Sequence, residues 1–195
     1  MSYRVATRRH CLILLKNRSI KLRARCKCAL KQIGSLRFRF GGMFAHAPCW
    51  RAIGLNPNSA LAHQMIGFVQ IWLGRPDVAI DHFLYARRLN PIDILSFTTS
   101  LGLASAQFLA GRNQEALVSA ERALTDNPKH LPLLRQCAAI FASCGQMEKA
   151  QEITRQLLQL SPNERISSMT RFRLFRRPKD AERQIAALRA AGLPE

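Results

Sequence analysis

The chain has 195 residues, 48% of them hydrophobic, and its 30 Lys and Arg against 12 Asp and Glu give a formal net charge of +18 at pH 7. This apolar content is enough to bury a core and excludes a disordered chain. A membrane-spanning helix is also excluded, because such a helix needs about 18 or more apolar residues and the run from Cys11 to Leu15 is much shorter.

The amino-terminal 48 residues are strongly basic. Residues 1–48 contain twelve Lys and Arg, and the first acidic residue of the chain is Asp77. Such a segment attracts phosphate groups or anionic lipid. Three interpretations stay open: an arm that binds nucleic acid or an acidic partner, an organelle transit peptide, and a non-native extension left by truncation or a frameshift of an upstream gene. We expect a poorly ordered arm.

The six cysteines do not form a pattern typical of a disulfide framework or a metal site. Cys26 and Cys28 lie in the basic segment, and with His10 and Cys11 they could be taken as a set of metal ligands. No second Cys-x-x-Cys or Cys/His set completes a metal site, so we interpret them as unrelated surface residues. We therefore expect no metal and no cofactor. A reducing compartment is the simpler inference, which predicts a cytoplasmic protein.

Beyond the arm, two sets of residues recur at nearly constant spacing. Pro-containing pairs lie 34, 37 and 34 residues apart, at Asn56-Pro57, Asn90-Pro91, Asn127-Pro128 and Ser161-Pro162. Gly74, Gly111 and Gly145 recur in step with them. A unit broken midway by Gly and ended by Pro predicts a helix-turn-helix that must stack on its neighbours to bury its apolar face. The predicted helices are 59–73, 77–89, 93–110, 113–125, 130–143 and 146–159.

Small residues are expected where such paired helices cross closely. Gly67, Ala104 and Ala138 lie at one such position, and Ala79, Ala116 and Ala150 lie at another. These residues resemble the tetratricopeptide repeat over roughly residues 56–162. The resemblance implies an all-α, tetratricopeptide-like solenoid of helical hairpins, with about three units in residues 49–162. We expect residues 163–195 to be a carboxy-terminal capping segment with a helix over 180–191, ended by Gly192.

Polar residues near the expected helix starts have structural interpretations. Asp77 and Asn113 are predicted to cap second helices, and Asn58 or Ser59 to cap the first helix of the array. Asp81 and His82 are interpreted as a solvated polar face. No combination of residues typical of catalysis is found, so we do not expect an enzyme.

A closer resemblance rests on three local features. The first helix of the middle unit, residues 93–110, is three residues longer than in the other units. Residues 108–112 (Phe-Leu-Ala-Gly-Arg) lead into Glu115-Ala116-Leu117, and the chain ends with residues 175–178 (Phe-Arg-Arg-Pro) and 188–195 (Leu-Arg-Ala-Ala-Gly-Leu-Pro-Glu). These features are similar to the carboxy-terminal repeat region of bacterial, rhizobial-type class III adenylate/guanylate cyclases. The resemblance implies a truncated relative of that regulatory region. The cyclase catalytic domain has no counterpart here.

The tetratricopeptide resemblance also implies a protein-binding groove lined by first-helix residues. In this chain they are Leu61, Gln64, Phe68, Ile71, Thr98, Leu101, Ser105, Phe108 and Arg135. Because the set is mainly apolar, it favours a protein partner that supplies an amphipathic helix or peptide. A second possibility is that the chain's own flanking segment covers part of the groove. The alternative function is nucleic-acid or acidic-partner binding through residues 1–48. The oligomeric state stays open.

Overall fold

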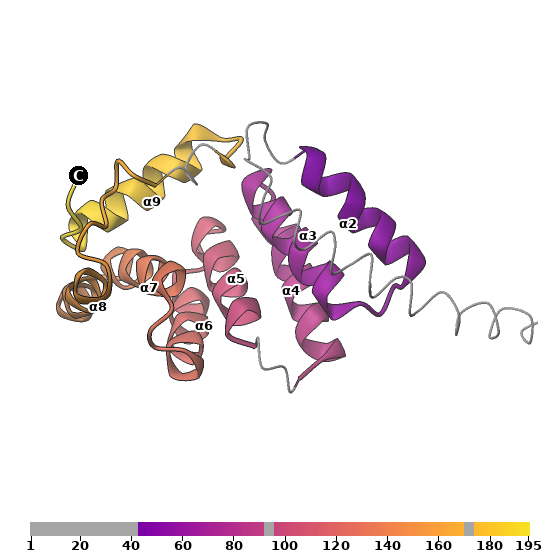
Figure 1. The fold of residues 1–195 in the computed structure, drawn as a ribbon, viewed down its shortest axis with the longest axis horizontal. Helices are drawn as coiled ribbons and strands as arrows, with labels where there is room; N and C mark the ends of the chain where they lie inside the picture. Colours follow the sequence, from indigo (N-terminus) through magenta and orange to yellow (C-terminus); the bar gives the residue numbers. More distant parts are fainter. Residues whose placement is uncertain (1–42, 92–95, 170–173) are drawn as a thin grey trace, which may run out of the picture. The chain divides into compact units, whose positions relative to one another are not determined.

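The computed structural model describes residues 43–91, 96–169 and 174–195, with side chains from Cys49 onward. These residues form eight α-helices and no strand, which confirms the all-α prediction (Figure 1). None of these helices is long and apolar enough to cross a membrane. The helices are α2 (Met43–Leu55), α3 (Ala60–Trp72), α4 (Pro76–Leu89), α5 (Ser96–Leu109), α6 (Asn113–Asp126), α7 (Leu131–Ser143), α8 (Met147–Leu160) and α9 (Pro178–Ala190).

Six of the helices form three consecutive hairpins. Helix α3 packs on α4, α5 on α6 and α7 on α8, and each second helix packs on the first helix of the next hairpin. Gly74, Gly111 and Gly145 make the turns within the hairpins, with φ of +73°, +81° and +79°. Other residues adopt this left-handed conformation only at a cost of about 1–2 kcal/mol. The predicted units are therefore present as stacked hairpins.

Helix α2 precedes the first hairpin and packs on α3. Residues 51–55 thus end a helix that lies beside the first unit. The helix begins at Met43, however, and not at the predicted boundary at Cys49. Pro48 lies inside this helix, where its missing N–H removes one backbone hydrogen bond. Residues 1–42 of the predicted arm (1–48) lie outside the described residues, whereas residues 43–48 belong to α2.

Two of the predicted helix caps are wrong. Helix α4 begins at Pro76 and α6 at Asn113, so Asp77 and Asn113 lie within the first turn instead of before it. Their side chains bond elsewhere: Asp77 accepts a hydrogen bond from Arg112 at 2.7 Å, and Asn113 Oδ1 accepts one from Arg183 at 3.1 Å. Ser59 does cap α3, because its hydroxyl accepts from the Ala62 amide at 3.3 Å.

The tightest packing in the array surrounds Phe83 on α4. Its ring is fully buried and lies against two glycines, Gly67 on α3 and Gly102 on α5. A Cβ at Gly67 would lie 2.6 Å from the ring, and a Cβ at Gly102 would lie closer still. Gly67 was expected at a close crossing, whereas Gly102 was not identified from the sequence. Phe83 therefore joins one hairpin to the next at two positions that exclude any side chain.

A pair of histidines joins α3 to α4. The Nδ1 atoms of His63 and His82 are 3.0 Å apart, and His63 Nε2 lies 3.0 Å from the Pro57 carbonyl. In the neutral rings, His63 Nε2–H donates to that carbonyl, so His63 Nδ1 must accept from His82 Nδ1–H. Trp50 of α2 contacts His82 edge-on at 5.7 Å. The interpretation of His82 as a solvated polar residue is wrong, because α2 and α3 both pack against its ring.

We expect Gly102→Ala to lower the free energy of unfolding by about 1–3 kcal/mol, because the new methyl group overlaps the Phe83 ring. Urea unfolding monitored by circular dichroism measures the change. Gly54→Ala in α2 is the matched control, since no atom lies within 4 Å of its added Cβ. Combining Gly102→Ala with Phe83→Leu should cost less than the sum of the two single changes. If the changes in the free energy of unfolding for the two substitutions add strictly, the predicted overlap between the new methyl group and the Phe83 ring is wrong.

We also expect the stability to fall in mild acid. Burial and the neighbouring His63 lower the pKa of His82 below 6.5, with Asp81 opposing them, and burial and Arg135 lower that of His130. A histidine with a depressed folded-state pKa contributes stability above its unfolded pKa, and this is lost as pH falls through the folded value. Urea unfolding at pH 7.5 and 5.5 should show a smaller loss for His82→Gln than for the native chain. Equal losses of stability in the two chains would show that His82 does not contribute to the fall in stability at acid pH.

Candidate protein-binding groove

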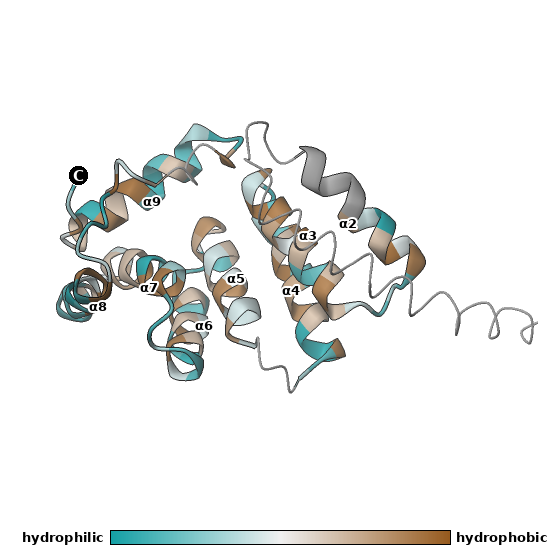
Figure 2. Cartoon of the chain, viewed as in Figure 1, coloured by the Kyte–Doolittle hydropathy of each residue, from teal (hydrophilic) through white to brown (hydrophobic). Residues whose placement is uncertain are grey.

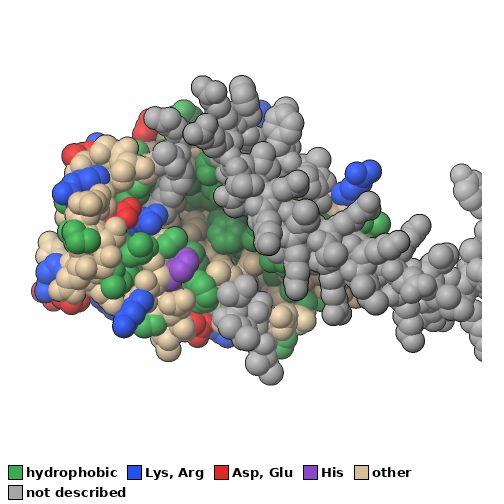
Figure 3. All heavy atoms as spheres, viewed as in Figure 1, with side chains coloured by type: hydrophobic (Ala, Val, Ile, Leu, Met, Phe, Trp, Pro, Cys, Tyr) green, Lys and Arg blue, Asp and Glu red, His purple; other side chains and the backbone are tan. Residues whose placement is uncertain are grey.

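The predicted groove residues lie on the three first helices, α3, α5 and α7. These helices are neighbours in the stack, because α5 contacts both α3 and α7. Hydrophobic residues are frequent along α3 and α5 (Figure 2). On the face of the molecule drawn in Figure 3, hydrophobic side chains lie in a hollow near the centre. The structure therefore brings the predicted set to one side of the array, although its members differ in exposure.

The α3–α5 part of the groove is partly accessible. Leu61 is 37% exposed, and Phe68 is half-buried with its ring edge-on to Phe83 at 5.1 Å. Leu101 and Ser105 lie deeper, each with an exposed fraction of 8%. Together these residues form an apolar floor with two larger side chains, Leu61 and Phe68, that a partner could contact.

The polar residues of this floor bond within the chain. Gln64 is buried and donates from its amide nitrogen to Thr98 and, at 2.9 Å, to Thr99, which joins α3 to α5. Ser105 donates to the Leu101 carbonyl at 2.8 Å. Gln64 thus holds α3 and α5 together, and Ser105 bonds within its own helix. A partner would meet mainly apolar surface here.

The α5–α7 part of the groove is covered by the carboxy-terminal segment. Phe108 is fully buried, and the Arg183 guanidinium lies over its ring at 4.5 Å from the centroid. Arg135 forms an ion pair with Glu164 at 3.0 Å, and both side chains are largely buried. Ile71 on α3 is also buried, at 3% exposure. Phe108 and Arg135 therefore do not face an open groove, because residues after Pro162 already contact them.

Helix α9 packs mainly on α7, which is a first helix. We expected residues 163–195 to cover the exposed end of the solenoid. Instead, the contacts of α9 lie with the groove-lining helices, and its amino-terminal end reaches the turn between α3 and α4. There the Arg176 amide donates to the Trp72 carbonyl at 2.8 Å, and the Arg177 side chain lies against Gly74.

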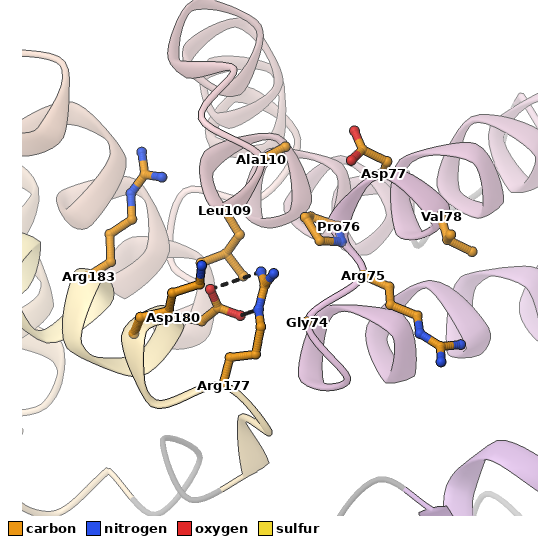
Figure 4. A pocket seen from close by; sticks show the side chains of 11 residues that line it. Gly74, Arg75, Pro76, Asp77, Val78, Leu109, Ala110, Arg177, Asp180 and Arg183 are labelled. Atoms are coloured by element: carbon orange, nitrogen blue, oxygen red, sulfur yellow. Dashed lines mark hydrogen bonds and ion pairs between the residues drawn. The ribbon is translucent and has the colours of Figure 1, made fainter.

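A pocket of about 700 Å³ lies where α9 meets that turn (Figure 4). Within it, Asp180 is bound by Arg177 through two hydrogen bonds of 2.8 and 3.0 Å. The pocket is lined by Gly74, Arg75, Pro76, Asp77, Val78, Leu109, Ala110, Arg177, Lys179, Asp180 and Arg183. It thus marks the junction of the carboxy-terminal segment with the first two hairpins.

The described residues contain no group suited to hold a metal. No three His, Cys, Asp or Glu side chains among them come close enough to do so. Cys137 is buried in the core, and burial raises the pKa of its thiol to about 12, so it stays protonated near neutral pH. The groove and its covering segment are therefore the best candidate functional site in the described part of the chain.

Comparison with known proteins agrees with this architecture. Residues 107–170 match the family model described as tetratricopeptide repeat. This match extends from the end of α5 through α8, which is about a third of the chain. No curated protein sequence matches the chain.

Several solved structures share the fold. The chain is similar to TTC0263, a thermophilic tetratricopeptide protein of Thermus thermophilus, at 21% identity and a TM-score of 0.57, covering 86% of this chain and 89% of that one. It is also similar to YrrB, a tetratricopeptide protein with an unusual peptide-binding site, at 18% identity, a TM-score of 0.52 and coverage of 84% and 79%. A third is the first tetratricopeptide domain of Spaghetti (RPAP3) bound to the HSP90 peptide SRMEEVD, at 19% identity, a TM-score of 0.50 and coverage of 68% and 92%. Residues 107–170 therefore match the tetratricopeptide repeat, and the described helices have the fold of a tetratricopeptide-like solenoid.

Proposed function

We propose that this chain is a protein-protein interaction module whose first helices bind a peptide or an amphipathic helix of a partner. Tetratricopeptide repeats generally mediate protein-protein interaction, and proteins of this fold are typically non-catalytic scaffolds. The observation that carries the proposal is the apolar floor on α3 and α5, with Leu61 and Phe68 accessible above it. The peptide-binding site of YrrB and the bound peptide of Spaghetti support this kind of partner.

The floor also determines which chemistry a partner needs. Helices α3 and α5 contain no Lys, Arg, Asp or Glu. Recognition there would rest on burial of apolar groups, and burying a Phe or Leu side chain contributes about 1.5–3 kcal/mol. An anionic peptide tail would find no cation on either helix. We therefore infer a partner segment with apolar side chains at helical spacing, whose affinity depends little on salt.

We further propose that the repeats derive from the regulatory region of a class III cyclase. Support comes from residues 108–112 and 188–195, which resemble that region. Any activity would then be that of a partner. Translating the genomic DNA upstream of the coding sequence in all three frames tests this origin. A cyclase-like coding stretch would support the proposal, and an unrelated upstream gene with its own stop codon would contradict it.

A second candidate function is nucleic-acid or acidic-partner binding through the amino-terminal arm. The specific observation is charge: residues 1–48 hold twelve of the 30 Lys and Arg of the chain and no acid. Binding of this kind is driven by counterion release and weakens steeply with salt. The two functions therefore predict different salt dependence and different locations on the chain.

We expect Phe68→Ala to weaken binding of a peptide selected against the chain from a displayed library by about 10- to 100-fold, because aromatic anchors dominate such interfaces. Fluorescence anisotropy at 50 and 300 mM salt gives the dissociation constants. Val118→Ala on α6 is the control, since Val118 is 69% exposed on a second helix. Unchanged affinity in Phe68→Ala would contradict the groove as the binding surface.

For the arm, we expect any binding of a single-stranded oligonucleotide to be lost when residues 1–42 are removed. In the full chain, log Kd should rise with log salt by about 0.7 for each phosphate contacted. Oligonucleotide binding that persists in the shortened chain would assign it to the repeats instead. Binding of the selected peptide should be the same in both chains.

A further inference from the structure

Helix α9 presents a continuous buried stripe to the array. Asp180, Gln184, Ala187, Leu188 and Ala191 are each at most 6% exposed, and apart from the adjacent pair Ala187 and Leu188 they are three or four residues apart. Such spacing places them on one face of a helix. Lys179, Glu182 and Arg189 lie outside the stripe and are exposed. The helix is therefore amphipathic, the form of ligand inferred for the groove.

The stripe lies on helices that would contact a partner. Helix α9 packs on α7, Arg183 stacks over Phe108 of α5, and the preceding Arg176 bonds to the last residue of α3. The contacts of α9 and of the residues just before it thus involve all three first helices. An amphipathic helix that lies in an apolar groove between helices is a common mode of peptide recognition. Here the helix in that position belongs to the same chain.

The anchoring of α9 is sparse compared with that of the repeat helices. Leu188 is the only large apolar side chain of α9 that is fully buried, whereas twelve of the fourteen residues of α5 are buried. The buried acid of α9, Asp180, is paired with Arg177 just before the helix. That ion pair would stay intact if α9 left the array. Detachment of α9 would therefore keep this ion pair and would break the hydrogen bond from Arg183 to Asn113 and the contact of Arg183 with Phe108.

We propose that α9 is an exchangeable occupant of the groove, and that a partner helix binds by replacing it. This inference rests on the proposed function and names the partner's chemistry. The partner helix would carry an arginine to stack on Phe108, with a small residue four positions later and a leucine five positions later, as Arg183, Ala187 and Leu188 do. In the absence of such a partner, α9 covers Phe108 and the face of α7 on which it packs.

The test uses the full chain and, as probe, a fluorescent peptide of residues 174–195. In Leu188→Ala the chain's own α9 is held less tightly, so we expect the peptide to bind at least tenfold more tightly than to the native chain. Val118→Ala, a matched truncation on α6, should bind the peptide like the native chain. A peptide that itself carries Leu188→Ala should bind weakly to every chain. Equal binding of the unaltered peptide to Leu188→Ala and Val118→Ala would overturn the proposal.

A second measurement avoids any variant that fails to fold. Hydrogen exchange of the native chain, followed by mass spectrometry, should show residues 178–190 exchanging at least tenfold faster than residues 131–143, because α9 opens alone. Exchange of both segments at one common rate would overturn the proposal, as would a native dimer formed by swapping α9 in sedimentation measurements. Neither result bears on Phe68, so the groove function and the exchange of α9 can fail independently.

Discussion

The packing of Phe83 between two backbones is the constraint on which the first half of the array depends. Gly67 and Gly102 bring α3 and α5 within contact of one aromatic ring that is wholly removed from water. Helices approach this closely only where a side chain is missing. Because a solenoid has no core apart from the contacts between neighbouring units, this crossing determines how the first hairpin meets the second.

This close approach also shapes the candidate site. With α3 and α5 close together, Gln64 reaches across to Thr98 and Thr99, and its amide is satisfied without any partner. The floor that results is apolar, rigid and free of charge. Leu61 remains 37% exposed, and Phe68 is half-buried with its ring against Phe83. The same residues that stabilise the stack thus make this surface apolar.

The carboxy-terminal segment divides the groove into two parts with different chemistry. On one side, α3 and α5 offer apolar contacts. On the other side, the charged side chain of Arg183 covers Phe108, and that of Glu164 pairs with Arg135. The amphipathic helix α9 follows the repeats and packs on α7.

The sequence alone determined the repeat units and most helix ends, because Pro and Gly act on the backbone locally: the φ of Gly74 or Gly192 requires no distant partner. It also identified the apolar row of the first helices, since helical spacing is a local property. Only the tertiary structure decided which of those residues are accessible. Phe108 and Arg135 are covered by residues more than 25 positions later in the chain, and Gly102 matters only because Phe83 arrives from another helix. Burial between distant segments depends on three-dimensional packing, which spacing along one chain does not encode.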